Sequence, residues 1–364
     1  MTNGKWVRKT AIGMTGLALL YSAAWYVIAD RLEDVVTRWT AERREQGWIA
    51  SYSAIQLEGF PFAWRANITD PTLASQGTLP AFRWSGPAMT LDWQPWNATR
   101  IGFTASGGHF LDLIDSSIDG TAKGSFRHAT GEILFGARGA LARLTLTLDN
   151  AILGERDSDR VEINRLDATL DTAPPPRKEA PAGKTASLRL TGSIHGLTLP
   201  KTSRAPLGRT IGGIEIDATL IGHIAPGKNG GATQEALAAW RDDGGIVEID
   251  HFDLGWSRLI LQSTGTLALD AGLQPIIATS ATIRGHSETL DALVRTGTLG
   301  AGEALMARMA FGLLQRGGGN GKPPEIKIPL TIQNGWLYVG PVKLLRMAPI
   351  RWRKHGRKHG RKQE

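Results

Sequence analysis

Apolar and polar residues alternate with a period of two in segment after segment of this chain. The alternating apolar positions include Phe62, Trp64, Ala66 and Ile68; Met89, Leu91 and Trp93; Leu144, Leu146 and Leu148; Ile214, Ile216, Ala218 and Leu220; and Ile326, Ile328 and Leu330. Strict alternation is typical of β-strands with one buried and one solvated face. Such segments recur roughly every ten to fourteen residues between Gly, Asp or Asn turns, which is the spacing of a meandering antiparallel sheet. The absence of a strand–helix–strand rhythm argues against a doubly wound nucleotide-binding fold.

The predicted fold class is therefore mainly β. We expect an extended, curved antiparallel sheet, groove-like or sandwich-like, with a few capping helices and one N-terminal transmembrane helix. Periodicity does not separate ordinary packed sandwiches from an open sheet whose apolar face forms a groove, because both place alternate residues on one face. The sequence alone therefore does not distinguish these two forms.

The composition excludes several classes of protein. The 364 residues contain no cysteine, which excludes disulfide scaffolds, thiolate zinc sites, iron–sulfur clusters and cysteine nucleophiles. A hydrophobic share of 41% with 21% charged residues excludes a disordered chain. The 44 glycines favour many turns between short strands.

The N-terminal segment has the length of a membrane span. Residues 10–29 carry no charge and would reach about 30 Å as a helix, the thickness of a bilayer core. Lys5, Arg8 and Lys9 precede them, so the positive-inside rule places residues 1–9 in the cytoplasm and the body in the periplasm. We expect a retained single-pass anchor in a bacterial inner membrane. The alternative is a cleaved signal peptide, with Ser22 and Ala24 before a cut at Trp25.

The exported body divides by pattern. We expect a juxtamembrane helix within 30–51, an N-terminal β region over 52–171, a Pro-rich linker or loop at 172–186, and a C-terminal β region over 187–345. A short helix is expected over 233–241 with Thr233 as its N-cap. A helical insert at 286–316 is expected to start with Ser287 as a cap and to cover an open end or edge of the sheet. Its apolar face could instead serve as a lid or lipid contact.

The basic charge is concentrated in the tail, residues 346–364. Eight basic residues face one acidic residue there, so the rest of the chain is nearly neutral. This distribution argues against nucleic acid as a partner. We expect a flexible polycation that contacts anionic lipid headgroups or other polyanions, the alternative being a merely solvated tail. The expected contacts are Arg353, Lys354, Arg357, Lys358, Arg361 and Lys362.

Residues capable of catalysis are sparse. The densest acid–histidine cluster contains Glu248, Asp250, His251 and Asp253. Adjacent residues of a strand point to opposite faces, so Asp250 and His251 could share a ligand only across a bulge, whereas Glu248 with Asp250, or His251 with Asp253, could share a face. A solvated outer face is the preferred interpretation, and an envelope hydrolase is the alternative. The common hydrolase, phosphate-binding and dinucleotide-binding motifs are absent, and we predict no catalytic residue, metal ligand or cofactor.

Tryptophan is concentrated near the start of the body. Six of the twelve tryptophans fall between Trp39 and Trp96. An indole ring suits a site that is apolar at one end and wet at the other. We therefore consider a lipid portal, with core filling as the alternative. The candidate portal residues are Trp64, Trp84, Trp93 and Trp96.

One segment carries a family resemblance. Gly59, Phe60, Pro61 and Phe62, followed by an alternating strand, resemble the Gly-Phe/Tyr-Pro-Phe signature of envelope proteins with one N-terminal anchor. The match is with the uncharacterised bacterial family called domain of unknown function 2125, and residues 329–344 resemble its closing hairpin. The four motif residues suit a sharp turn into a strand, which is a structural role.

More distantly, the anchor, the turn and the succession of strands are similar to AsmA-like and TamB-like proteins, in which a long β-groove is thought to hold or pass lipids. That likeness implies a protein of envelope maintenance that binds or passes a lipid or amphiphile in an apolar groove. The alternative is a non-enzymatic adaptor or scaffold in an envelope complex, in which protein partners contact a closed sheet.

Overall fold

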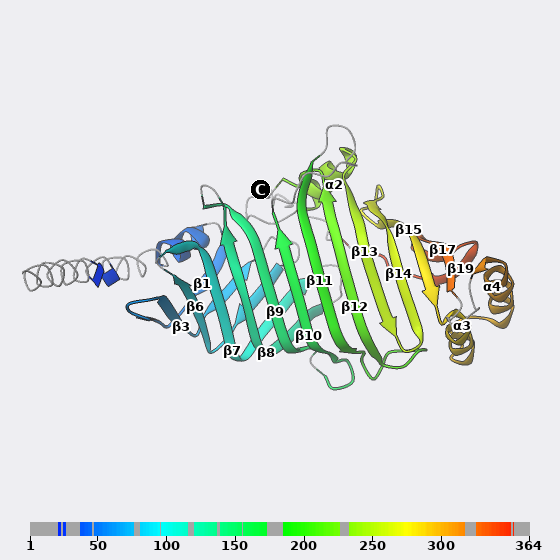
Figure 1. Cartoon of the computed structure of the whole chain (residues 1–364), viewed down its shortest axis with the longest axis horizontal. Helices are drawn as coiled ribbons and strands as arrows, with labels where there is room; N and C mark the ends of the chain where they lie inside the picture. The colour runs from blue at the N-terminus through cyan, green and yellow to red at the C-terminus, as the bar shows by residue number, and fades with distance from the viewer. Residues whose placement is uncertain are drawn as a thin grey trace, which may run out of the picture.

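The computed structural model describes residues 21–22, 25–26, 37–45, 47–75, 81–94, 96–115, 120–136, 139–154, 156–172, 185–225, 233–316, 325–350 and 352. The protein is mainly β, with most of the described residues in strands. The described strands join one curved antiparallel sheet of 19 strands, which Figure 1 shows along its length. The prediction of a mainly β chain built on a curved antiparallel sheet is confirmed, and the sheet is single rather than divided into two sandwiches.

The first strands combine into long strands that are interrupted near their middle. They are β1 (Trp48–Ser51), β2 (Ala54–Glu58), β3 (Trp64–Thr69), β4 (Thr72–Ser75), β5 (Ala81–Ser85), β6 (Ala88–Gln94) and β7 (Asn97–Asp115). β1 and β2 pair with β4 and β3, and these pair in turn with β5 and β6. Both β5 and β6 pair with the long strand β7. The chain therefore runs up and down as a simple meander.

The interruptions lie side by side and form one line across the sheet, which we call the fold line. The amide of Ser53 donates to the carbonyl of Thr69 at 2.9 Å, and the amide of Gly86 donates to the carbonyl of Pro71 at 3.2 Å. In β7 the line passes Gly107, whose φ of +103° suits glycine. At the same level the ladder between β7 and β8 (Gly120–Phe135) shifts register. Beyond the line the strands turn back behind the front of the sheet (Figure 1).

The middle of the sheet is a series of long hairpins. These strands are β9 (Leu141–Leu153), β10 (Val161–Asp171), β11 (Ala186–Thr198), β12 (Thr210–Ile221), β13 (Ile246–Trp256), β14 (Leu259–Leu269) and β15 (Pro275–Arg284). Residues 173–184 of the predicted linker lie outside the described residues. The strands on either side of it pair directly, with Leu170 opposite Leu190. The two predicted β regions are therefore one continuous sheet.

The helix α2 (Gln234–Asp242) joins β12 to β13. The hydroxyl of Thr233 accepts a hydrogen bond from the amide of Ala236 at 3.2 Å, so the predicted N-cap is confirmed. Trp240 is buried and its indole donates to the carbonyl of Ile221 at 2.8 Å. This bond fixes the helix to the end of β12.

Two helices cover the C-terminal end of the sheet. They are α3 (His286–Arg295) and α4 (Ala301–Leu314), and the neighbouring strands are β16 (Gln315–Arg316), β17 (Glu325–Gln333), β18 (Trp336–Val339) and β19 (Val342–Arg346). Leu290 and Phe311 from the helices pack with Ala281, Ile326 and Ile328 in one buried cluster. The helical insert thus covers an end of the sheet, as the sequence predicts.

The N-cap of α3 was predicted wrongly. The cap is Gly285, with φ of +71°, and Ser287 lies inside the helix. A Cβ on Gly285 would lie 2.0 Å from the carbonyl oxygen of Arg258. Position 285 therefore requires glycine, because its backbone lies close to the β13–β14 turn. The hydroxyl of Ser287 does not cap the helix.

The segment before the sheet is partly described. Residues 37–45 are helical and β1 begins at Trp48, and residues 30–36 of the segment predicted to contain a juxtamembrane helix lie outside the described residues. Of the predicted anchor, only residues 21–22 and 25–26 are described, and these are helical. Within the part of the chain that the structure describes, no helix combines the length and the apolar character needed to cross a membrane.

Candidate functional site

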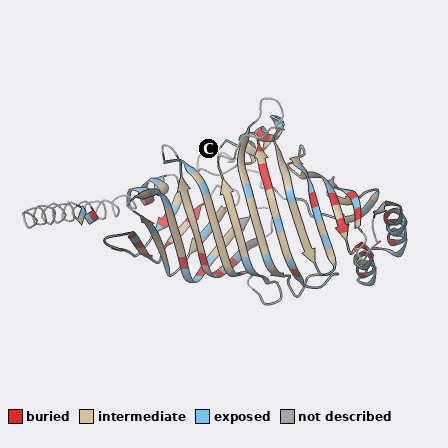
Figure 2. Cartoon of the chain, viewed as in Figure 1, coloured by how far each residue is buried: buried red, intermediate tan, exposed pale blue. Residues whose placement is uncertain are grey.

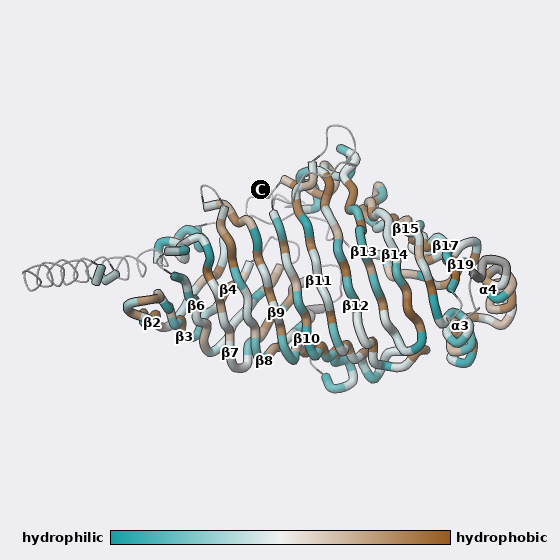
Figure 3. Tube along the Cα trace, in the orientation of Figure 1, coloured by the Kyte–Doolittle hydropathy of each residue, from teal (hydrophilic) through white to brown (hydrophobic). Residues whose placement is uncertain are grey.

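One face of the sheet is apolar from its second strand to its seventeenth. Paired residues of antiparallel strands lie on the same face, so the register gives the rows that cross the sheet. One row is Leu57, Ala66, Leu91, Phe103, Gly131, Leu146, Ala168, Gly192, Ile216, Phe252, Ser263, Ala281 and Ile328. The next is Ile55, Ile68, Met89, Ala105, Ala129, Leu148, Leu166, Ile194, Ile214, Leu254, Leu261, Ile283 and Ile326. We call this surface the apolar face, and Figure 3 shows the alternation that produces it.

The apolar face is buried along the fold line and mixed in exposure at the opposite rim, where Ala218, the cross-strand partner of Leu190, is 8% exposed. Near the line, Ala105 and Ala129 are 3% exposed. One row further, Gly131 and Gly192 are half-buried, and Leu190 at the rim is 40% exposed. Figure 2 shows most of the front strands half-buried. Leu146, Leu148 and Ile194 of the middle strands pack against the buried cluster that contains Ala105, Phe126 and Ala129. Ala168, Gly192 and Ile216 in the next row are half-buried, and among the described residues α3 and α4 cover only the C-terminal end of this face.

The opposite surface of the same strands, which we call the polar face, carries paired charges. The Nε of Arg189 lies 2.8 Å from the Oδ1 of Asp217, and the Nε of Arg165 lies 2.8 Å from the Oδ2 of Asp167. The hydrogen bond that Asp167 accepts from Arg165 lowers the pKa of Asp167, and the hydrogen bond from the hydroxyl of Thr147 lowers it further. The polar face is therefore a solvated exterior with internal charge balance.

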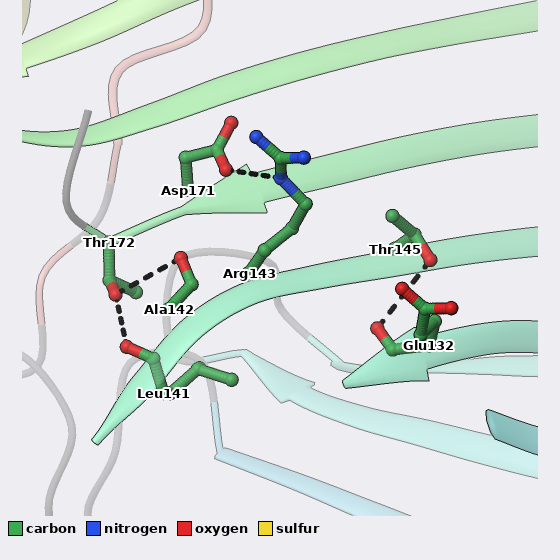
Figure 4. A network of polar contacts seen from close by, with 7 residues as sticks. All are labelled: Glu132, Leu141, Ala142, Arg143, Thr145, Asp171 and Thr172. Carbon is green, nitrogen blue, oxygen red and sulfur yellow. Dashed lines mark hydrogen bonds and ion pairs between the residues drawn. The ribbon is translucent and has the colours of Figure 1, made fainter. Parts of the chain in front are cut away.

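The rim of the polar face is tied where β10 ends (Figure 4). Arg143 on β9 forms an ion pair with Asp171 on β10. The hydroxyl of Thr172 donates to the carbonyl of Leu141. These contacts hold the two strand ends together at the point where the Pro-rich segment begins.

Three potential metal ligands meet on the polar face. Glu215 on β12 lies directly opposite Asp253 on β13, and the Nε2 of His251 lies 3.0 Å from the Oδ2 of Asp253. One ligand atom of each lies within 4.8 Å of the other two. Beside them, a hollow of about 300 Å³ includes Asp217 and His251 in its lining. Glu215 and His251 are exposed, so the group is a surface cluster rather than an enclosed centre.

The sequence anticipated two of the three members of this cluster. His251 and Asp253 share a face, as predicted, whereas Glu215 was missed because it comes from another strand. Asp250 lies at an irregularity of the β12–β13 register, where the hydroxyl of Thr219 donates to it at 3.4 Å. Glu248 pairs with Thr219 further along the ladder. The four acid and histidine residues of 248–253 are therefore not gathered into one site.

The four candidate portal tryptophans are distributed over three places. Trp64 and Trp93 are paired across β3 and β6, with ring centroids 5.9 Å apart. Trp84 lies beyond the fold line, where its ring stacks on His109 at 5.7 Å. Trp96 is 66% exposed in the β6–β7 turn. Trp84 therefore lies apart from the other three, and Trp64 and Trp93 both belong to the apolar face.

The turn formed by residues 59–63 is the contact point of the N-terminal helical residues. The indole of Trp25 donates to the carbonyl of Ala63 at 3.2 Å, and its ring meets Phe60 edge-on at 5.4 Å. The Phe60–Pro61 bond is cis, and Gly59 has φ of +102°. A Cβ on Gly59 would lie 2.7 Å from the carbonyl oxygen of Ala63, so the tight turn requires glycine. The motif therefore forms a tight turn, as predicted, and also contacts the N-terminal helical residues through Trp25.

A family model described as an uncharacterised protein conserved in bacteria (DUF2125) matches residues 25–348. The chain belongs to this family. Neither the curated proteins nor the solved structures include a match to it. The DUF2125 region begins at Trp25, the residue that packs on Trp64, and includes the whole described sheet.

The end of the DUF2125 region is held against the body. In its closing hairpin, the Nζ of Lys343 lies 3.7 Å from the centre of the Trp336 ring. Past β19, the amide of Ile350 donates to the side chain of Gln274 at 2.7 Å, and the indole of Trp352 donates to the carbonyl of Leu273 at 3.2 Å. The predicted polyanion contacts, from Arg353 to Lys362, lie outside the described residues.

Proposed function

We propose that this DUF2125 protein is a single-pass, inner-membrane-anchored periplasmic protein of envelope maintenance that binds or passes a lipid or other amphiphile along the apolar face. The uncharged run at 10–29 and the basic residues before it support the anchor and its orientation. The likeness to AsmA-like and TamB-like proteins enters as an analogy of architecture.

The continuous apolar face carries this proposal. A sheet built only to support itself would bury its apolar rows under a second layer. Here the first row is buried at Ala281 and Ile328, beneath α3 and α4, and half-buried at Ala168, Gly192 and Ile216 in the middle. An acyl chain lying on these residues would gain about 0.8 kcal/mol for each methylene removed from water. The surface therefore favours long hydrocarbon chains over compact polar ligands.

The polar face supports the same assignment by contrast. Its Arg165–Asp167 and Arg189–Asp217 pairs keep the outside of these strands solvated. A ligand with an apolar tail is thus directed to one surface of the sheet.

The proposal is tested by the lipid that accompanies the protein. The full chain is expressed in a bacterium, extracted in detergent and examined by native mass spectrometry and lipid extraction. We expect stoichiometric phospholipid or another amphiphile. The double variant Ile194→Gln with Ile216→Gln should lower the bound amount several-fold, because amide groups on the apolar face would lose hydrogen bonds under an acyl chain.

The matched control places the same side chain on the polar face of the same sheet region. Thr191→Gln with Ser193→Gln should retain the lipid. A lipid-free mass for the wild-type chain, or equal losses from both double variants, would contradict the proposal and favour the adaptor alternative.

The basic tail is included in the proposal as a polyanion contact. Removing every residue after Trp352 should weaken binding of the chain to anionic vesicles at low salt, where screening is least. Unchanged binding would contradict this role.

A further inference from the structure

Four exposed aromatic residues gather at the N-terminal end of the sheet. The exposed fractions are 62% for Tyr26, 46% for Phe60, 72% for Phe62 and 66% for Trp96. The rings of Tyr26 and Phe60 stack with centroids 5.8 Å apart. We call these four residues the aromatic tip.

The aromatic tip combines three pieces of chain that the fold brings to one end. Phe60 and Phe62 lie in the turn between β2 and β3, and Trp96 lies in the turn between β6 and β7. Because Trp64 pairs with Trp93, these two turns leave neighbouring strands at the same end. Tyr26 joins them from the helical residues before the sheet. In Figure 1 the β2–β3 hairpin and those helical residues lie at the same end of the molecule.

Water is a poor environment for this surface. Residues 59–63 contain no charged side chain, and neither does the Pro95–Trp96 pair. Exposed aromatic rings with a polar backbone at hand are typical of the interface between headgroups and hydrocarbon. An apolar cluster of this kind on a solvated protein marks an interaction surface.

The sequence at residues 10–29 indicates what covers the aromatic tip. The uncharged run at 10–29 includes Tyr26 near its end, and Trp25 is bonded to the same turn as Phe60. A bilayer that contains this run would therefore meet Phe60 and Phe62 at its surface.

We propose that the aromatic tip lies in the interfacial layer of the bilayer that holds residues 10–29, so that the apolar face begins at the membrane surface. This rests on the proposed anchor and deepens the proposed function, because a lipid leaving the leaflet would meet Trp64 and Trp93 without crossing water. The ligand would accordingly be taken from the leaflet on the body side of the membrane.

The absence of cysteine makes the test clean, since one introduced thiol reports one position. Phe62→Cys and Trp96→Cys are labelled with an environment-sensitive nitrobenzoxadiazole dye. The matched control is Phe110→Cys, because Phe110 is 59% exposed but lies in β7 beyond the fold line. Each full chain is reconstituted into vesicles of phosphatidylethanolamine and phosphatidylglycerol, and membrane association is checked by flotation.

We expect the labels at positions 62 and 96 to emit at shorter wavelength and with several-fold higher intensity than the label at 110, and to resist quenching by aqueous iodide. Chains that float while all three labels stay water-like would overturn the inference and leave the anchor intact. Chains that do not float would overturn both this inference and the proposed membrane anchor. Lipid occupancy of the apolar face is measured separately, so its failure is distinguishable from failure of the tip.

Discussion

At the residue scale, the fold line depends on one buried histidine. His109 is 0% exposed, and its ring stacks between Trp84 at 5.7 Å and Phe126 at 5.0 Å. Neither ring nitrogen has a hydrogen-bond partner of good geometry among the described residues. Burial lowers the pKa of His109, outweighing the nearby backbone groups of Ser106 and Ala88. The site therefore accepts a neutral ring.

This histidine should make the fold acid-sensitive. The unfolded chain takes up a proton at the ordinary pKa of 6.5, whereas the folded chain resists it until lower pH. The contribution of His109 to the free energy of unfolding is therefore fully present above pH 6.5. It is lost as the pH falls from 6.5 toward the lower pKa of the folded state. His109→Phe should reduce this fall, measured as the urea midpoint against pH. Some fall should remain, because burial also lowers the pKa of His286. An unchanged pH profile would contradict the role of His109.

Gly86 provides the space for that ring. A Cβ at this position would lie 1.8 Å from the Nδ1 of His109, and the ring cannot retreat between two aromatic neighbours. Gly86→Ala should therefore destabilise the fold by about 1–3 kcal/mol through overpacking. Gly212→Ala is the control, because its Cβ would meet nothing closer than 3.5 Å. Equal urea midpoints for the two variants would show that the ring is not clamped.

Sequence reasoning at this scale reached local features and missed those made by register. Thr233 could be recognised as an N-cap from its own neighbours. The proximity of Glu215 to His251 could not be predicted, because neither segment alone specifies the register in which β12 pairs with β13. Ser287 was mistaken for a cap because the crowding of Gly285 against Arg258 is a tertiary effect.

At the scale of elements, α4 has two surfaces with different roles. Phe311 is 5% exposed and packs on the strands, whereas Leu305 and Met309 are 57% and 61% exposed. Phe311→Ala should cost about 3–5 kcal/mol, because it opens a cavity over the end of the sheet. Met309→Ala should change stability by less than about 0.5 kcal/mol. The check is the urea midpoint of each full-length variant, and a comparable loss at Met309 would contradict this orientation of the helix.

The elements were largely predictable because alternation is a local property of each strand. Their connection was less predictable. The Pro-rich composition of 172–186 indicated a linker or a loop, and the pairing of Leu170 with Leu190 favours a loop between neighbouring strands. The sequence does not predict that the breaks near Asp70 and Gly86 align in one fold line, because this alignment depends on how neighbouring strands pair.

At the scale of the whole molecule, the two faces of one sheet account for the architecture. Period-two patterning fixes which residues share a strand face, and only the register makes those faces continuous from Leu57 to Ile328. The sequence therefore left packed sandwiches and an open groove unresolved. The topology shows one curved antiparallel sheet rather than two packed sandwiches.

The most direct test of the account is to locate a bound acyl chain. The full-length protein is loaded with a phosphatidylethanolamine that carries a diazirine in its acyl chain, irradiated, digested and mapped by mass spectrometry. We predict crosslinks to apolar-face residues of β9 to β13, such as Leu146, Ile194 and Ile216, with their polar-face neighbours Thr147 and Ser193 unmodified. Crosslinks spread equally over both faces, or none on the apolar face, would contradict the central claim that this face holds lipid.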